Sequence, residues 1–315
     1  MHSMTAPQRR FLLLGAAGAP LAVFCGGGSL LWAVPALALI SLLDMYLERC
    51  IPAEQSLAAL LPRWLLWPEL AFLILAATRM AGAVDLVWAG SADFPLFPLA
   101  LLVLAGAQAT IGTASAGRCA TVLGWAEAIF FAAILGVTAA QTAPPAQAGE
   151  PVEALSVIFC LLTVCCGLFL PAEKDQKGGV LWGALALLTM LILYVTAGKG
   201  GELPILTAVK SADILGVLQR FESLCSCAIT AGLFLLLSVF ACASGEILRA
   251  LGLEKCPPAL PLLPAAILLA VEKAVPDWVY LAGAAIFWGG VPLVALGLVG
   301  RTARQKRGGK TRKKC

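Results

Sequence analysis

The stretch Gly216–Arg249, GVLQRFESLCSCAITAGLFLLLSVFACASGEILR, contains a long apolar run with a charged pair at each end. Arg220 and Glu222 precede the run, and Glu246 and Arg249 follow it. Between these pairs no side chain is ionisable apart from cysteines. Crossing a hydrocarbon layer of roughly 30 Å takes about 20 helical residues, so the run is long enough. We therefore expect a transmembrane helix here.

The composition extends this interpretation to the whole chain. Of the 315 residues, 60% are hydrophobic and only 13% are charged. A soluble domain is nearer half apolar and a quarter charged. The excess occurs in blocks of 15–25 residues, and such blocks form helices in lipid because backbone polar groups cannot remain unpaired there. The sequence therefore predicts an all-α integral membrane protein.

The apolar blocks predict about ten transmembrane helices. We expect one transmembrane domain over 1–300, built from two five-helix halves at about 10–140 and 152–299. The blocks are about 10–25, 28–43, 64–84, 94–112, 120–140, 152–171, 178–198, 223–248, 257–271 and 278–299.

Two long internal loops, about 44–63 and 199–222, occupy matching positions in the halves. Each leads into a block that opens with a base and an acid: Arg63 and Glu69 in the first half, and the Arg220 pair in the second. Five helices plus five is the inverted-repeat plan of many secondary transporters. These features favour a transporter-like bundle.

The basic residues indicate how the chain is oriented. With a cytoplasmic N-terminus and ten spans, 17 of the 22 Lys and Arg residues face the cytoplasm. This is the bias known as the positive-inside rule. We expect both termini in the cytoplasm, with a first span after Arg9 and Arg10 favoured over a cleaved secretory signal.

The segment 301–315 carries eight bases and no acid, while the whole chain has a net charge of +4. The remaining residues are therefore net negative, which argues against a nucleic-acid partner. We expect 301–315 to form a disordered basic tail along the anionic inner leaflet.

Catalytic and metal-binding patterns are missing from the sequence. The one histidine is His2, no CxxC motif occurs, and most cysteines lie inside apolar blocks. There is no nucleophile elbow and no phosphate-binding loop. We expect buried structural cysteines, no metal, no cofactor and no enzyme activity.

Glu127 is the most informative single residue, because it lies near the centre of the fifth block. A central acid costs roughly 2.5–3.5 kcal/mol on insertion scales, so it should face the bundle interior, protonated or paired.

Thr78 with Arg79, and Arg220 with Glu222, lie near the outer interface. They are candidates for structural or gating charges, or for interfacial anchors. Arg220 and Glu222 are two residues apart, so each should find a different partner: water, headgroups or another chain.

The second half resembles the spore germination permease family, which supplies the B subunit of nutrient germinant receptors. The resemblance rests on LFLPAEKDQKG (Leu168–Gly178) closing the sixth block and ELPILTAVKSADILGVLQRFESL (Glu202–Leu224) opening the eighth. The first half is similar more loosely, in ATRMAGAVDLV (Ala77–Val87) and RCATVLGWAEAIF (Arg118–Phe130).

The family is similar to the amino acid–polyamine–organocation transporters. The resemblance implies a ten-helix bundle with a ligand site where the first and sixth helices break. In this sequence Gly15 and Gly18 stand in the first block, while Thr163 and Cys165 replace the family's glycine and acid in the sixth. The sixth block has neither Gly nor Pro from 154 to 166, so an unbroken helix is expected there. With Glu127, these residues form the predicted ligand site.

The resemblance also implies a function. The chain would be a membrane subunit that senses an amino acid or a similar small nutrient and triggers germination. It would assemble with an A subunit and a lipoprotein C subunit in the spore inner membrane. Two alternatives remain open: a free-standing amino acid or polyamine transporter of the cell membrane, and a scaffold subunit with a degenerate ligand site.

Overall fold

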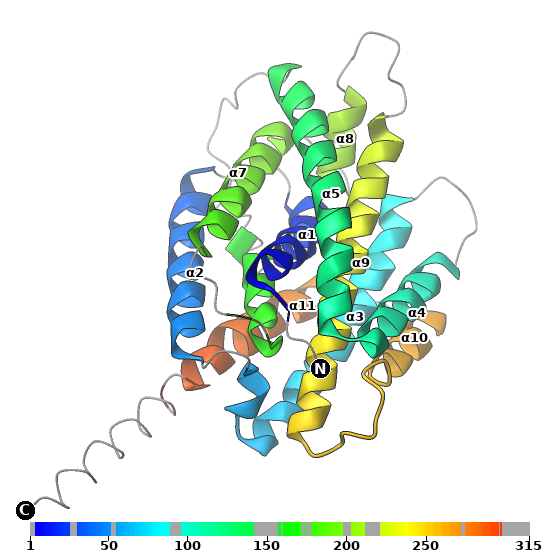
Figure 1. Ribbon diagram of the computed structural model, residues 1–315. Helices are drawn as coiled ribbons and strands as arrows, with labels where there is room; N and C mark the ends of the chain where they lie inside the picture. The colour runs from blue at the N-terminus through cyan, green and yellow to red at the C-terminus, as the bar shows by residue number, and fades with distance from the viewer. Residues whose placement is uncertain are drawn as a thin grey trace, which may run out of the picture.

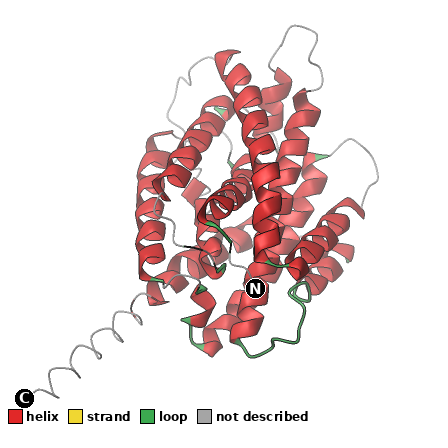
Figure 2. Ribbon diagram, in the orientation of Figure 1, coloured by secondary structure: helices red, strands yellow, loops and turns green. Residues whose placement is uncertain are grey.

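The structure is a computed structural model that describes residues 4–25, 30–51, 55–88, 96–141, 157–158, 160–171, 173, 178–197, 203–211, 221–271, 275–295 and 297. Helix dominates these ranges, and none of them contains a strand (Figure 2). The helices are α1 (Ala6–Phe24), α2 (Leu30–Cys50), η1 (Leu57–Ala59), α3 (Arg63–Val87), α4 (Leu96–Ile111), α5 (Thr113–Gln141), η2 (Thr163–Phe169), α7 (Gly178–Thr196), α8 (Pro204–Ser211), α9 (Phe221–Ala250), α10 (Leu262–Ala270), α11 (Asp277–Gly283) and η3 (Ala284–Gly290).

Five helices in the described ranges are long and apolar enough to cross a membrane, which supports an integral membrane protein. They are Arg63–Val87, Thr113–Ala140, Gly179–Thr196, Glu222–Ala250 and Trp278–Ala295. Shorter apolar helices at Leu96–Ile111 and Cys160–Phe169 accompany them. The ten-span count and the inverted repeat stay predictions.

The bundle is organised around α9 and α1 (Figure 1). The α9 helix, which includes residues 221–249 of the long apolar stretch, packs against α1, α3, α4, α5 and α8. The α1 helix lies between α5, α7 and α9, and most of its side chains from Leu12 to Val23 are buried. A helix buried on every side needs apolar or small residues all round, and the sequence of α1 meets that requirement.

The central part of α1 reads GAAGAP, from Gly15 to Pro20. Small side chains let helix backbones approach closely in a membrane bundle. The α1 residues of this stretch are all buried, and Pro20 lies inside the helix. Because Pro20 has no N–H, one helical hydrogen bond is missing in this turn. The close contacts of α1 follow directly from this composition.

The sixth apolar block is not the unbroken α-helix that its lack of Gly and Pro predicts. Its α-helical part ends at Leu162, and Thr163–Phe169 form a buried 3₁₀ helix, η2. A Cβ on Gly167 would lie 2.5 Å from Leu13 of α1, so only glycine allows this approach. The change to a tighter helix is a tertiary effect, which local propensity does not reveal.

Two other segments differ in detail from the expected blocks. The region expected as a loop at 199–222 contains the helix α8. In the last block α11 continues into a π-helical turn, η3, before α-helix resumes at Val291. The tail 301–315 and Arg220 lie outside the described residues, so the predictions about them are untested.

Candidate ligand site in the bundle core

Glu127 is the middle residue of α5, with 14 helical residues before it and 14 after it. At about 1.5 Å per residue, each end of the helix is roughly 21 Å away. The side chain is buried, with 4% of its surface exposed. The sequence-based expectation that this acid faces the bundle interior is confirmed.

The carboxyl group of Glu127 lies against three glycines from two other helices. A Cβ on Gly15 of α1 would lie 2.6 Å from Oε2, and one on Gly232 of α9 would lie 2.6 Å from Oε1. At Gly18 the corresponding distance to Oε1 is 3.4 Å. Real Cβ atoms do not approach oxygen this closely, so Gly15 and Gly232 make the space that the carboxyl occupies. We call these four residues the glycine niche.

Neither carboxyl oxygen of Glu127 has a hydrogen-bond partner among the described residues, and no ion pair to Glu127 occurs there. A buried polar group without a partner costs free energy, and an unpaired charge costs considerably more. The group is therefore stable there either as the neutral acid or as a carboxylate with a bound cation. Both possibilities are typical of a functional acid in a membrane bundle.

The glycine niche adjoins a groove of about 280 Å³ between α1, α5 and α7. Glu127 is the one polar side chain among the residues that line it. The lining residues are Leu14, Gly15, Gly124, Glu127, Ala128, Phe131, Ala132, Leu135, Gly136, Ala184, Leu187, Leu188 and Leu191.

The structure separates the predicted ligand residues into two places. Gly15, Gly18 and Glu127 come together in the niche. Thr163 instead lies 3.1 Å from the hydroxyl of Tyr280, measured from its Oγ1, and Cys165 is fully buried in η2. Neither of these two residues lines the groove.

Thr78 is buried in the bundle, and Arg79 beside it is half-buried. The Thr78 hydroxyl donates to the Ile74 carbonyl of its own helix at 2.9 Å. The Arg79 guanidinium lies over the Phe24 ring, 4.8 Å from its centroid, at the C-terminal end of α1. Stacking on an aromatic face stabilises a cation away from bulk water, and the helix C-terminus adds a favourable partial charge. The position of Arg79 relative to the outer interface stays a prediction.

Glu222 pairs with Lys210 of α8, at 2.8 Å between Nζ and Oε1. The expectation of water, headgroups or another chain as its partner is wrong, because α8 was not anticipated in the loop. The pair joins α8 to the first turn of α9 and is largely exposed. At the other end of α9, Glu246 and Arg249 form the expected i, i+3 pair at 2.6 Å.

A second acid, Glu69 of α3, is fully buried and has no ion-pair partner among the described residues. The indole of Trp288 lies beside it and interacts with the carboxyl group, although no hydrogen bond of standard geometry joins the two side chains. The ring of Trp288 packs against Phe72 and Phe240 at centroid distances of 5.0 and 5.5 Å. Trp288 belongs to the π-helical turn η3, a type of irregularity frequent at functional sites.

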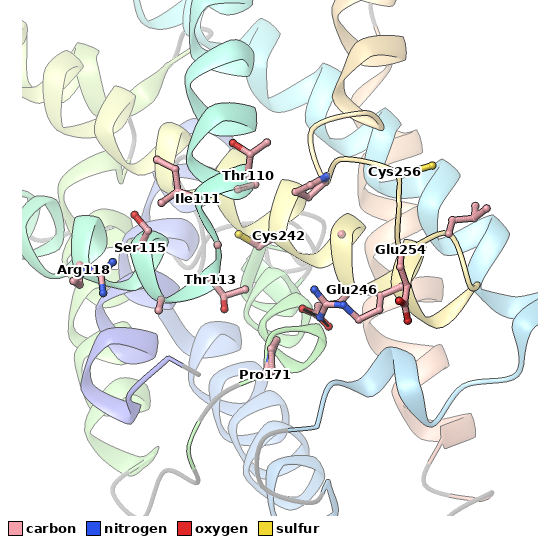
Figure 3. Close-up of a pocket in the computed structure, with 17 residues that line it drawn as sticks. Thr110, Ile111, Thr113, Ser115, Arg118, Pro171, Cys242, Glu246, Glu254 and Cys256 are labelled. Atoms are coloured by element: carbon pink, nitrogen blue, oxygen red, sulfur yellow. Dashed lines mark hydrogen bonds and ion pairs between the residues drawn. The ribbon is translucent and has the colours of Figure 1, made fainter. Parts of the chain in front are cut away.

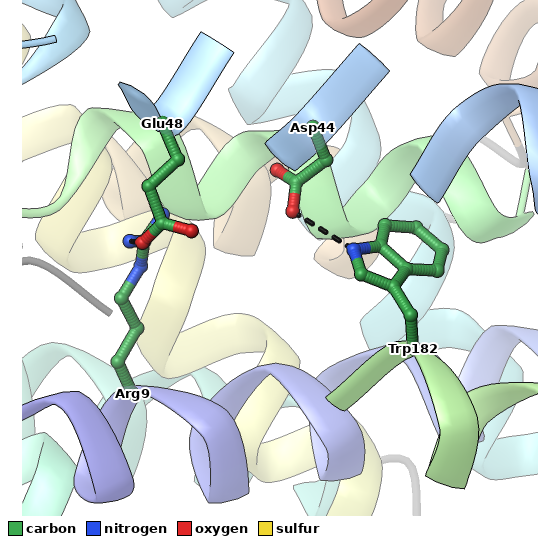
Figure 4. Close-up of polar contacts among 4 residues, drawn as sticks. All are labelled: Arg9, Asp44, Glu48 and Trp182. Carbon is green, nitrogen blue, oxygen red and sulfur yellow. Dashed lines mark hydrogen bonds and ion pairs between the residues drawn. The ribbon is translucent and has the colours of Figure 1, made fainter. Parts of the chain in front are cut away.

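A polar cluster joins α1, α2 and α7 at one end of the bundle (Figure 4). Arg9 forms an ion pair with Glu48, and the Trp182 Nε1 donates to Asp44 Oδ2 at 3.1 Å. Arg9 and Asp44 are both buried. These partners let a base and an acid enter the helix interface without being left unpaired.

A cavity of about 590 Å³ lies where α4 turns into α5 beside the end of α9 (Figure 3). Gly112 forms the turn with a φ of +115°, which favours glycine. Two arginines and two glutamates line this cavity: Arg118, Arg249, Glu246 and Glu254. Because their charges balance, the cavity does not select one sign of ligand.

Sequence reasoning missed two residues of the interior. Gly232 gives one weak signal, since it is a glycine within the apolar run of α9. Glu69 was noted as a charge near the start of its span, but nothing in its neighbourhood predicts complete burial. The interior positions of both residues depend on which helices pack against each other, and the sequence of a single span does not determine that packing.

The comparisons with known proteins identify no relative. No family model matches the sequence, and no curated protein matches it significantly. Among the described residues, no group of three His, Cys, Asp or Glu side chains is placed to hold a metal ion. The ten cysteines in the described ranges are all free.

Proposed function

We propose that this chain is a membrane receptor subunit that binds a small nutrient amine at Glu127 and signals its presence. The observation that carries the proposal is the unpartnered Glu127 carboxyl in the glycine niche. A ligand ammonium would give this group the charge partner that the described protein residues do not supply. Movement of α1 against α9 then couples binding to the rest of the bundle, because the niche lies between these helices.

The resemblance to spore germination permeases supports a sensing role within a larger receptor. In this proposal the chain works in the spore inner membrane, with both termini in the cytoplasm, and assembles with an A subunit and a lipoprotein C subunit. The ion pair between Lys210 and Glu222 supports the packing of α8 against α9. In this proposal α8 lies on the outer side, and its exposed residues Thr207, Lys210 and Ser211 offer a surface to partner subunits.

A free-standing secondary transporter is the second candidate, and Glu69 favours it. Two buried acids without an ion-pair partner among the described residues, one on α3 and one on α5, are a typical feature of proton-coupled transport. Uptake of a labelled amine or amino acid by the purified protein alone, in liposomes with a pH gradient, would support this function over sensing.

The test of the receptor proposal is Glu127→Gln in spores, which removes the charge and preserves the size. We expect normal protein level and normal co-purification with the other subunits, but a response to nutrient weakened at least tenfold. A charge-assisted hydrogen bond contributes about 1.5–3 kcal/mol, which corresponds to roughly ten- to a hundredfold in affinity. The control is Glu254→Gln, which neutralises an exposed acid. Normal germination in Glu127→Gln spores would contradict the proposal.

A further inference from the structure

The position of the groove mouth indicates from which side a ligand reaches Glu127. The groove opens between α5 and α7 beside Leu187, the middle residue of α7, whose side chain is 67% exposed. On α5 the outward side chains around Glu127 are apolar and exposed as well, with Trp125 and Ile129 as the nearest. The middle of a spanning helix lies in the hydrocarbon layer. The mouth therefore faces acyl chains and not water.

The chemistry of the lining limits what the groove can hold. Its one polar side chain is the Glu127 carboxyl, and its other lining residues are aliphatic, aromatic or glycine. A ligand with a carboxylate, such as an amino acid, would place that charge against apolar groups without a partner, which is strongly unfavourable. A ligand with an amine and an apolar body matches both parts of the site.

We propose that the groove binds an amphiphilic amine that lacks a carboxylate and enters from the hydrocarbon layer. This inference rests on the proposed function and names the ligand class for the same site. The amine crosses the lipid as the neutral base and meets Glu127 as the neutral acid. The proton then moves from the carboxyl oxygen to the amine nitrogen, and the resulting ammonium and carboxylate form an ion pair against the glycine niche.

The size of the groove sets the size of the ligand. One water molecule occupies about 30 Å³ of liquid, so about 280 Å³ corresponds to roughly nine waters. An amine with a short branched alkyl chain fits this space. We choose 3-methylbutylamine as the probe, because leucine has the same alkyl group and differs by the carboxylate.

The test measures binding of radiolabelled 3-methylbutylamine and leucine to the full-length protein in lipid nanodiscs. Glu127→Gln removes the charge. Gly136→Leu places a large side chain at the groove, because Gly136 lines the groove and a Cβ there meets no atom within 4 Å. Gly179→Leu is the matched control, since Gly179 of α7 is equally open but is not part of the lining.

We expect saturable binding of the amine, no binding of leucine, and at least a tenfold loss of amine affinity in Glu127→Gln and Gly136→Leu. Gly179→Leu should bind within twofold of the wild type. Leucine binding as tight as amine binding would overturn the inference. So would wild-type affinity in Gly136→Leu combined with loss in Glu127→Gln. That second result would leave the proposed function intact. It would mean that the ligand reaches Glu127 by a path other than the groove.

Two further results would also overturn the inference. If neither probe binds and a native lipid co-purifies in the groove, the occupant is a lipid chain. If the amine binds equally to wild type and Glu127→Gln, the carboxyl is not the binding group, and the proposed function fails with the inference.

Discussion

At the scale of single residues, the interior contains two acids whose surroundings differ. Glu127 lies beside three glycines and a groove, so a ligand has space to reach it. Glu69 lies among packed aromatic rings next to the Trp288 indole. A binding role suits the first acid. For Glu69 the suitable ligand is a proton, because a proton needs no space between the packed rings.

Gly232→Ala should disturb the glycine niche directly. The new Cβ would lie 2.6 Å from Glu127 Oε1 and 3.0 Å from the Gly15 carbonyl oxygen, so the carboxyl or α1 must move. Overpacking of this kind costs about 1–3 kcal/mol. Thermal unfolding in detergent, followed by loss of the monodisperse peak on size exclusion, measures the change.

The matched control for this prediction is Gly136→Ala on α5, where the added methyl meets open space. That change should be neutral or slightly stabilising, since alanine favours helix by up to about 1 kcal/mol over glycine. Equal stability of the two variants would show that the niche is not tightly packed.

Glu69→Met should stabilise the protein. Removing a buried acid that has no ion-pair partner among the described residues relieves a desolvation cost of about 1–3 kcal/mol, and methionine has a similar length and tolerates irregular packing. The same thermal assay checks the prediction. A clear loss of stability would mean that Glu69 has a partner in the folded protein. Loss of pH-dependent activity with gain of stability would assign Glu69 a proton-binding role.

At the scale of elements, α8 and α9 illustrate what a local pattern can predict. The apolar run of α9 was long enough to predict a spanning helix, and Glu222–Ala250 forms one. The loop before it gave no expectation of a helix, although α8 forms there with its apolar residues Ile205 and Leu206 buried. A short amphipathic helix is stabilised by the surface on which it packs, so its own eight residues carry a weak signal.

Glu222→Lys should loosen α8 from α9, because it places two cations together where the structure has an ion pair. Exposed pairs contribute at most about 1 kcal/mol, so global stability should change little. The measurable effect is faster amide hydrogen exchange across Pro204–Ser211 at low salt. The reversed pair, Lys210→Glu with Glu222→Lys, should restore slow exchange. Persistent fast exchange in the reversed pair would show that the ion pair does not hold α8.

At the scale of the whole molecule, the direction of the chain in the membrane can be tested at the two ends of α9. Ser211 of α8 and Glu254 of the following turn are both exposed and lie at opposite ends of this helix, which is about 45 Å long. With both termini in the cytoplasm, a cysteine at 211 should react with an impermeant reagent from outside, and one at 254 should not. The opposite pattern would reject the proposed orientation.

Much of the secondary structure was predictable, because apolar block length and hydropathy are properties of one segment. The membrane class, the burial of Glu127 and the i, i+3 pair at Glu246 were obtained in this way. Helix neighbours are a property of the whole bundle. The approach of Gly232 to Glu127, the 3₁₀ segment at Thr163 and the contact of Arg79 with Phe24 depend on such neighbours, so the sequence did not predict them.

The central position of α1 has a consequence for biosynthesis. Its main packing partner, α9, begins 197 residues after α1 ends. At roughly 5–20 residues per second, the ribosome needs about 10–40 s to supply it. During this time the narrow α1 surface that later receives Gly232 faces lipid or the insertion machinery. The α1 helix, although synthesised well before α9, is thus among the last to finish folding, and chains that stop before α9 should be recognised as incomplete and degraded.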